Sequence, residues 1–363
     1  MSVRAFALCG VCALGCIRNL PSPGAGAGRV VGLAEYAVLD HQDFAYTIAW
    51  SPDSEAVAYT HLTAKAFAAS WWSGAGLHVR KRAELNGTDA DVEALAFSPD
   101  GRALASASRD GSLRLHDVAT GVLSATCPVG EPLTAVAFAP SGNEVWVGTA
   151  SGWVKALSLP GCVPGDQVRH GSEEVRALAV APDGRLFAGG WEQTLAQYAP
   201  PQGLKRVAAW SMGACVNDVT LDRAGRVLGV ALSEGKAERS FEIYQREKRG
   251  QVELSRPGDR AALVEGEGGR PLRTWFAHRG VVATAAVSPD GQTLASGGWD
   301  KRLVVNGVAG GEAFERTFGW SVRRVRFSPD GRFLAVAAWT PQTAGESTRP
   351  PSAVVYRVLY ASP

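Results

Sequence analysis

The chain has 363 residues, of which 46% are apolar and 20% are charged. This composition is typical of a folded protein and excludes a disordered one. The 37 basic and 35 acidic side chains give a net charge of +2 at pH 7. Such a balance provides no long-range attraction to nucleic acid or to an acidic membrane surface, so we expect no nucleic-acid partner.

The N-terminal segment predicts a secretion signal over residues 1–15. Arg4 precedes the apolar, small-residue run Ala5–Gly15, which is too short to span a bilayer as a helix. The following Cys16 completes Ala-Leu-Gly-Cys, which resembles a bacterial lipobox. We expect lipid attachment at Cys16, a flexible tether over residues 16–29, and an extracytoplasmic, membrane-anchored location in the periplasm or at the outer membrane. An ordinary signal peptide and an uncleaved, cytoplasmic N-terminus are the alternatives.

A short pattern recurs along the rest of the chain. In Val322–Gly331 it reads Val-Arg-Arg-Val-Arg-Phe-Ser-Pro-Asp-Gly, and a weaker copy ends at Ser54. The apolar residues indicate a strand, and proline and glycine supply a tight turn, so each copy predicts a hairpin. The turn glycines are spaced by 41, 42, 41, 66 and 40 residues and are Gly101, Gly142, Gly184, Gly225, Gly291 and Gly331.

A period of about 40–45 residues with four short strands per unit is the spacing of propeller blades. The spacing predicts one all-β domain over residues 30–363, a seven-bladed β-propeller with four-stranded antiparallel blades. The last unit, Val322–Tyr360, lacks an outer strand, whereas Val30–Leu39 is an extra strand before the first unit. We expect Gly32–Leu39 to complete that last blade and to close the ring.

The second unit carries the strongest resemblance to a known family. After Phe97-Ser-Pro-Asp-Gly it has Ser106, a turn aspartate at Asp110, and His116-Asp117 at the end of the third strand. It resembles the WD-repeat (WD40) β-propeller family, and the resemblance covers about residues 33–360. It implies a structural His–Ser–Asp–Trp network, left incomplete because His116 and Asn306 replace the tryptophan. The residues that match this network are Ser106 and Asp110 in the second unit and His278, Ser296 and Asp300 in the sixth.

The sequence contains no visible set of nucleophile, base and orienting residue. The repeated turn aspartates are explained by bonding to nearby backbone, and the cysteine spacing is no metal signature. We therefore expect no enzyme activity, no cofactor and no metal. A disulfide between Cys127 and Cys162 is possible in an oxidising compartment, and small buried thiols are the alternative.

Tryptophans and irregular loops predict one binding face. Trp191 and Trp299 each precede the position of a second-to-third-strand turn, and the segments His61–Ala75, Glu234–Asp259 and Thr340–Ser352 follow second strands. Insertions on one face of a repeat scaffold mark its binding face, and tryptophan is favoured at interface hot spots. Packing of the tryptophans between blades is the alternative. The predicted partner-binding residues are Trp71, Trp72, Arg109, Trp191, Trp210, Trp299, Trp320 and Trp339.

These features predict a monomeric, non-catalytic scaffold that binds a protein or peptide and reaches the membrane only through its lipid. A propeller enzyme with its active site at the channel mouth and a cytoplasmic scaffold are the alternative functions.

Overall fold

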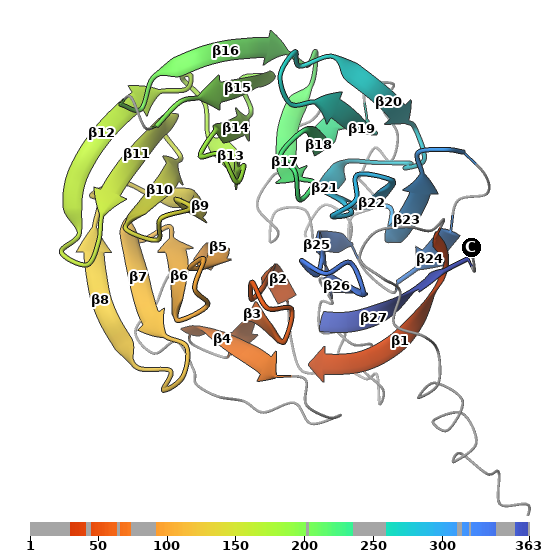
Figure 1. The fold of residues 1–363 in the computed structure, drawn as a ribbon, viewed down its shortest axis with the longest axis horizontal. Coiled ribbons are helices and arrows are strands. Elements are labelled where there is room, and N and C mark those ends of the chain that lie inside the picture. The colour runs from red at the N-terminus through yellow and green to blue at the C-terminus, as the bar shows by residue number, and fades with distance from the viewer. Residues whose placement is uncertain are drawn as a thin grey trace, which may run out of the picture.

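The computed structural model describes residues 30–40, 45–63, 66–73, 92–200, 203–234, 259–310, 314–318, 321–338 and 353–361. Within these ranges the chain forms seven antiparallel sheets around a central axis (Figure 1). Six sheets have four strands, and the first has three among the described residues. The prediction of an all-β, seven-bladed propeller is confirmed. These ranges contain no helix that is long and apolar enough to cross a membrane.

Each blade contributes its strands from the channel outward. The innermost strands are β2 (Ala45–Trp50), β5 (Val92–Phe97), β9 (Leu133–Phe138), β13 (Val175–Val180), β17 (Cys215–Leu221), β21 (Val282–Val287) and β25 (Val322–Phe327). The second strands are β3 (Ala56–Thr63), β6 (Ala103–Ser108), β10 (Glu144–Thr149), β14 (Leu186–Gly190), β18 (Val227–Ser233), β22 (Thr293–Gly298) and β26 (Phe333–Ala338). The third strands are β4 (Ala66–Ser73), β7 (Ser112–Asp117), β11 (Trp153–Ser158), β15 (Thr194–Tyr198), β19 (Arg260–Glu265), β23 (Arg302–Gly307) and β27 (Ala353–Tyr360). The outermost strands are β8 (Leu123–Pro128), β12 (Val163–Arg169), β16 (Arg206–Ser211), β20 (Pro271–Trp275), β24 (Phe314–Thr317) and β1 (Val30–Asp40).

The Ser-Pro-Asp-Gly motif forms the turn between first and second strands. In blade two, Ser98 Oγ donates to Asp100 Oδ1 at 2.6 Å, and Asp100 Oδ1 accepts the Arg102 N–H at 3.0 Å. Ser98 Oγ also accepts the Ala103 N–H at 2.9 Å. Gly101 has φ of 71°, a conformation that glycine adopts without steric cost. The structure therefore confirms that the turn aspartate bonds nearby backbone, the role that the sequence analysis predicted.

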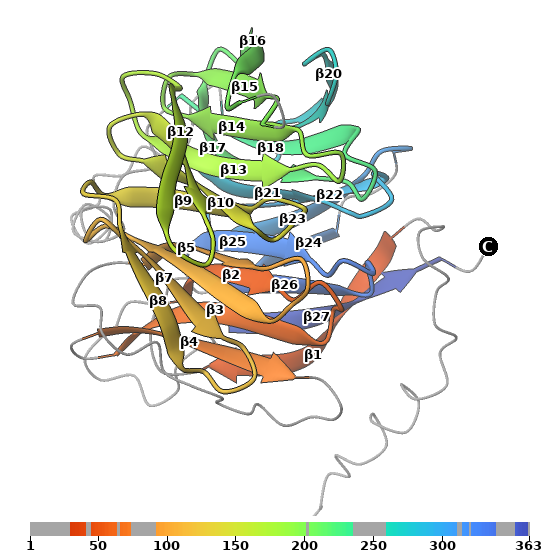
Figure 2. The same cartoon turned by 60° about the vertical axis from the view of Figure 1, so that its left-hand side comes forward.

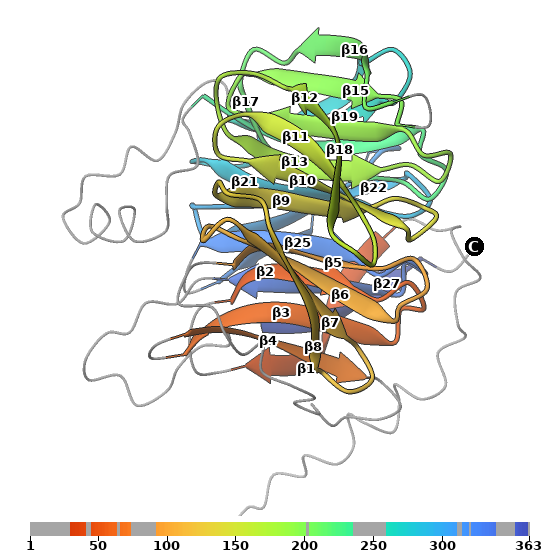
Figure 3. The same ribbon diagram turned by 90° about the vertical axis from the view of Figure 1, so that its left-hand side faces the viewer.

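These turns gather at one end of the ring. A β-carbon added at Gly101 would lie 3.6 Å from Pro52 of the preceding blade, and one at Gly142 would lie 3.7 Å from Pro99. We call this end the PDG face. The opposite end, where second strands lead into third strands and one blade leads into the next, is called the connection face. In side view the strands run between these two faces (Figure 2, Figure 3).

The N-terminal strand closes the ring as predicted. Strand β1 pairs antiparallel with β27, with Leu33 opposite Val358 and Val38 opposite Val354 (Figure 1). The indole N–H of Trp50 in blade one donates to the Arg326 carbonyl in blade seven at 2.9 Å. Blade seven is thus built from both ends of the propeller sequence, and this pairing closes the ring.

The hydrophobic core lies between neighbouring blades. Val216 of blade five, which is fully buried, packs with Phe187 and Leu195 of blade four. Gly189 permits this approach, because a β-carbon there would lie 2.2 Å from the Val216 side chain. Trp146 is also buried in such an interface, at 2% exposure. Each sheet therefore buries its two faces against other sheets, as a propeller requires.

The segment His61–Ala75 differs from the expected irregular loop. Strands β3 and β4 pair in continuous register from Thr63–Ala66 to Ala56–Ser73. Because Trp72 pairs with Val57, which also pairs with Trp50, the backbone of Trp71 and Trp72 lies toward the PDG face. The prediction that these two residues belong to the connection face is wrong. Residues 56–73, which include both strands and the turn between them, contain no glycine, proline or asparagine, so no turn signal marks this hairpin in the sequence.

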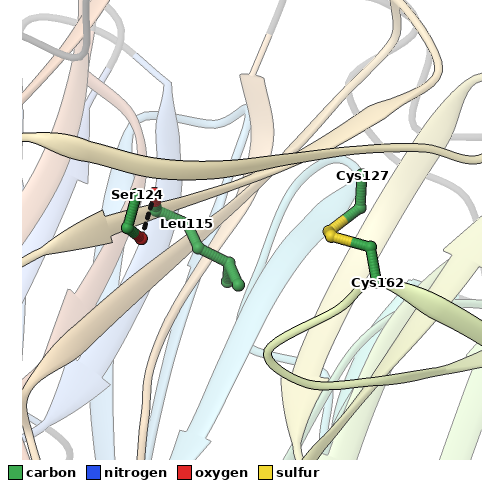
Figure 4. The surroundings of a disulfide bond; sticks show 4 residues. All are labelled: Leu115, Ser124, Cys127 and Cys162. Atoms are coloured by element: carbon green, nitrogen blue, oxygen red, sulfur yellow. Dashed lines mark hydrogen bonds between the residues drawn. A yellow bond between two sulfur atoms is a disulfide. The ribbon is translucent and has the colours of Figure 1, made fainter.

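A disulfide joins two neighbouring blades. Cys127, in the outer strand of blade two, is bonded to Cys162, which directly precedes β12 of blade three (Figure 4). Nearby, Ser124 Oγ donates to the Leu115 carbonyl at 2.9 Å and ties β8 to β7. The two possibilities that the sequence left open are thus resolved in favour of the disulfide.

Candidate functional site: the connection face and the channel

A network of four buried charges crosses the channel at the connection face. Arg109 Nε lies 2.5 Å from Glu93 Oε1, and its Nη2 lies 3.1 Å from Glu174 Oε1. Arg176 Nη1 lies 2.6 Å from Glu174 Oε1 and 3.6 Å from Glu93 Oε2. All four side chains are at most 10% exposed. The network is balanced in charge and links blade two to blade four.

The pairing keeps these groups ionised. Burial raises the pKa of Glu93, but the guanidinium groups of Arg176 and Arg109 outweigh it, so that pKa lies below its usual range. Burial lowers the pKa of Arg176, and the charges of Glu174 and Glu93 raise it above its usual range overall. A carboxylate held in this way does not act as a general acid near pH 7. Among the described residues no group of three His, Cys, Asp or Glu side chains is placed to hold a metal ion.

A second network lies deeper in the channel. Asp218 of β17 is buried and lies 3.0 Å from Arg324 Nη1 and 2.7 Å from Arg326 Nη1. Thr284 Oγ1 donates to Asp218 Oδ2 at 2.6 Å. Burial raises the pKa of Asp218, and the two guanidinium groups outweigh it and hold that pKa below its usual range. The sequence analysis did not predict either network. The available signal was the presence of charged residues in innermost strands that are otherwise largely apolar.

The predicted partner-binding tryptophans have three different environments. Trp191, at the β14–β15 turn, is half-buried on the connection face, with the Arg176 guanidinium 5.9 Å from its ring centroid. Trp299 holds the same position in blade six but is only 7% exposed, which favours a structural role. Trp210 packs between blades four and five, because a β-carbon at Gly269 would lie 2.1 Å from its ring. For Trp210 the structure therefore matches the alternative interpretation, packing between blades.

The other predicted residues divide between buried and undescribed positions. Arg109 is 10% exposed and engaged by Glu93 and Glu174, so it presents little surface to a partner. Trp320, Trp339 and Cys16 lie outside the described residues, and their roles stay predictions. The same holds for most of Glu234–Asp259 and for the loop Thr340–Ser352.

Phe276 is the most exposed large apolar side chain in the described ranges. It is 66% exposed and follows β20 on the connection face. Trp153, at the same face of blade three, is half-buried beneath the Arg169 guanidinium, 5.1 Å from its centroid. The sequence analysis left Trp153 undecided and did not single out Phe276. The available signal was an aromatic residue directly beyond an outer strand.

The predicted structural network forms in blade six. His278 Nε2 lies 2.9 Å from Ser296 Oγ, and His278 Nδ1 lies 3.0 Å from Asp300 Oδ1. Asp300 also accepts the Arg279 N–H at 2.9 Å. The fourth member is missing as expected, because Asn306 replaces the tryptophan, and its side-chain amide nitrogen has no hydrogen-bond partner among the described residues. In blade two, Asp110 accepts the Ser112 N–H at 2.9 Å, whereas Ser106 Oγ has no partner.

Seven antiparallel sheets around one channel, joined within the blades by Ser-Pro-Asp-Gly turns, define the fold class as a seven-bladed β-propeller. Residues 80–117 and 269–305 match the family described as WD domain, G-beta repeat. Two solved structures have the same fold. "Structure of U3-55K" has a TM-score of 0.71 at 16% identity, and "Crystal structure of RRP9 WD40 repeats" has 0.70 at 15%. Each comparison covers 90% of this chain and 100% of the other.

Curated relatives are similar over shorter stretches. The guanine nucleotide-binding protein subunit beta of Arabidopsis thaliana is 31% identical over 126 residues, which is 32% of this chain and 33% of the relative. Ribosome biogenesis protein BOP1 of Homo sapiens is 34% identical over 111 residues, which is 31% of this chain and 12% of the relative. The chain thus spans no more than about a third of either relative.

Proposed function

We propose that this chain is a non-catalytic WD-repeat scaffold that binds a protein or peptide through its connection face and is anchored by lipid on Cys16 outside the cytoplasm. The observation that carries the binding role is Phe276, 66% exposed at that face. The names of the relatives, a subunit of a guanine nucleotide-binding protein and a ribosome biogenesis protein, support an interaction role.

The connection that presents Phe276 is held rigidly by its neighbours. Arg302 Nη1 donates to the Ala277 carbonyl at 2.5 Å, and the buried His278 is fixed by Asp300 and Ser296. An aromatic side chain on a preorganised support loses little conformational entropy on binding. Such a residue contributes about 2 kcal/mol or more when a partner buries it. Trp191 and Trp153 would add apolar area on the same face.

Two features support the anchored, extracytoplasmic part of the proposal. The disulfide between Cys127 and Cys162 is of a kind that persists in oxidising compartments. Val30 pairs with Tyr360, so the propeller's first described residue lies at the PDG end of β1 (Figure 3). A tether joined there would leave the connection face directed away from the membrane.

The binding role is tested with Phe276→Ala, using crosslinking in the native cell to identify partners and purified proteins to measure affinity. We expect at least a tenfold loss of affinity, about 1.4 kcal/mol. The matched control is Val207→Ala, because Val207 is 53% exposed on outer strand β16 and lies away from the connection face. Equal affinity of the wild type and of folded Phe276→Ala would reject this face as the contact surface.

The anchor is tested separately by metabolic labelling with a fatty-acid analogue. We expect label on the wild type and none on Cys16→Ala, with the protein recovered in the membrane fraction only when labelled. An unlabelled wild type whose Cys127 and Cys162 are both free thiols in the cell would favour the cytoplasmic alternative.

A further inference from the structure

The channel contains a cavity that the proposed partner surface does not use. Its volume is about 370 Å³, within the range of small-molecule sites. Its charged lining residues are Arg176, Asp218, Arg324 and Arg326. The lining reaches Pro329 in the turn of blade seven. The cavity therefore extends toward the PDG face from the four-charge network of Glu93, Arg109, Glu174 and Arg176, which we call the mouth network. Arg326 is 26% exposed and can be reached from solvent.

Positive charge around this cavity exceeds negative charge. Arg176 is matched within the mouth network, where two guanidinium groups face two carboxylates. Deeper in the channel, Arg324 and Arg326 share the single carboxylate Asp218. Burial lowers the pKa of Arg324 and the neighbouring guanidinium groups lower it further, while Asp218 compensates only in part. Among the described residues, one positive charge in the channel is left without a counter-charge, which is costly in a partly buried site.

The two deeper arginines, Arg324 and Arg326, supply hydrogen-bond donors at the cavity. Arginine groups bind carboxylate and phosphate oxygens with paired N–H donors. An anion in the cavity would accept from these donors and supply the missing charge.

We propose that the channel binds the oxyanion of a small molecule, a carboxylate or a phosphate, through Arg326 and Arg324. The ligand enters from the PDG face. The site is separate from the connection face and does not depend on the proposed partner role. The non-polar remainder of the lining, which includes Ala96 and Ala179, leaves room for a short carbon chain beside the anionic group.

The experiment is isothermal titration calorimetry of the full folded chain at constant ionic strength. The probes are succinate, inorganic phosphate and the neutral analogue succinamide. We expect saturable one-to-one binding of succinate or of phosphate and no heat with succinamide, and the acid that binds identifies the source of the oxyanion. Absence of saturable binding for both acids would overturn the proposal.

Three variants locate the binding. Arg326→Gln removes the surplus charge and is expected to weaken binding at least tenfold. Arg270→Gln is the matched control, because its side chain is 71% exposed on the rim, and it should bind as the wild type does. Ala96→Leu keeps every charge but narrows the cavity, and we expect at least a fivefold loss. Equal losses in Arg326→Gln and Arg270→Gln would show general screening and reject the site. If Arg326→Gln does not fold, unchanged affinity in Ala96→Leu rejects it.

Discussion

Blades two and six carry the same two motif residues and use them differently. Each has a serine in its second strand, Ser106 or Ser296, and an aspartate in the following turn, Asp110 or Asp300. In blade six a histidine joins the pair into one buried network. In blade two Ser106 Oγ has no partner, and the blade is instead cross-linked to blade three by a disulfide.

The difference shows that a motif residue contributes only when its partners are present. Ser106 is 1% exposed and matches the family pattern, yet its hydroxyl makes no hydrogen bond among the described residues. His116, which stands in place of the motif tryptophan, likewise has two ring nitrogens without partners. Blade two therefore lacks the buried histidine network that contributes to the stability of blade six, and it has the covalent link to blade three instead.

The strongest way to test this comparison is to remove the disulfide. Cys127 and Cys162 are 35 residues apart, and opening a loop of that size costs about 3–4 kcal/mol of unfolding free energy in the chain-entropy treatment. We expect dithiothreitol to lower the urea concentration at the midpoint of unfolding of the wild type. Unfolding is monitored by tryptophan fluorescence. The control is Cys127→Ala with Cys162→Ser, which should not respond to dithiothreitol. A wild-type midpoint that dithiothreitol leaves unchanged would contradict the prediction.

The next largest difference should appear at the turn aspartates. Asp300→Ala leaves His278 and the backbone N–H groups of Arg279 and Arg302 without their acceptor, and we expect a loss of about 3 kcal/mol. Asp110→Ala removes a side chain that is 25% exposed, at a cost of about 1 kcal/mol. Both are measured by urea unfolding. Equal losses would mean that the two networks are equivalent after all.

The serines give a smaller but cleaner contrast. Ser296→Ala removes the partner of His278 Nε2, a buried nitrogen 2.9 Å away, and we expect a loss of about 1–2 kcal/mol. Ser106→Ala removes a hydroxyl that has no partner, so its effect should stay within about 0.5 kcal/mol. The thermal midpoints of the two variants provide the measurement. A larger loss in Ser106→Ala than in Ser296→Ala would reverse the assignment of the working network.

The smallest expected effect on stability, near pH 6, comes from the titration of His116. Burial and the neighbouring Arg114 lower the pKa of His116 to about 4. The unfolded chain takes up a proton near pH 6.5 and the folded chain does not, so stability falls as the pH drops from about 6.5 toward 4. We expect His116→Leu to flatten the pH dependence of the thermal midpoint. Part of the slope should remain, because burial also lowers the pKa of His170 to about 4. A slope identical to that of the wild type would show that His116 does not titrate in this way.

The fold could be predicted from the sequence because each blade repeats one local rule. A strand, a Ser-Pro-Asp-Gly turn and a period near 41 residues specify the hairpin and its spacing, and closure by Gly32–Leu39 follows from counting strands. The hairpin between β3 and β4 was missed because no turn residue marks it.

The candidate site was harder to predict, because it depends on contacts between blades. Arg109 was predicted to bind a partner. In the folded chain it is engaged by Glu174, which lies 65 positions further along the sequence and comes close to it only when the blades are assembled. Asp218 and Arg326 are 108 positions apart. The equivalent positions of Trp191 and Trp299 gave the correct turn for both, yet Trp191 is half-buried and Trp299 is only 7% exposed.

The pairing of β1 with β27 has a consequence for how the protein is made. Val30 and Tyr360 are opposite each other, so β1, which is synthesised before the other strands of the propeller, has no partner until β27 has been synthesised. Contacts of such high sequence separation form late and slowly. Closure of the ring is therefore expected to be the final step of folding, and truncation before residue 353 would leave β1 as an unpaired, aggregation-prone edge.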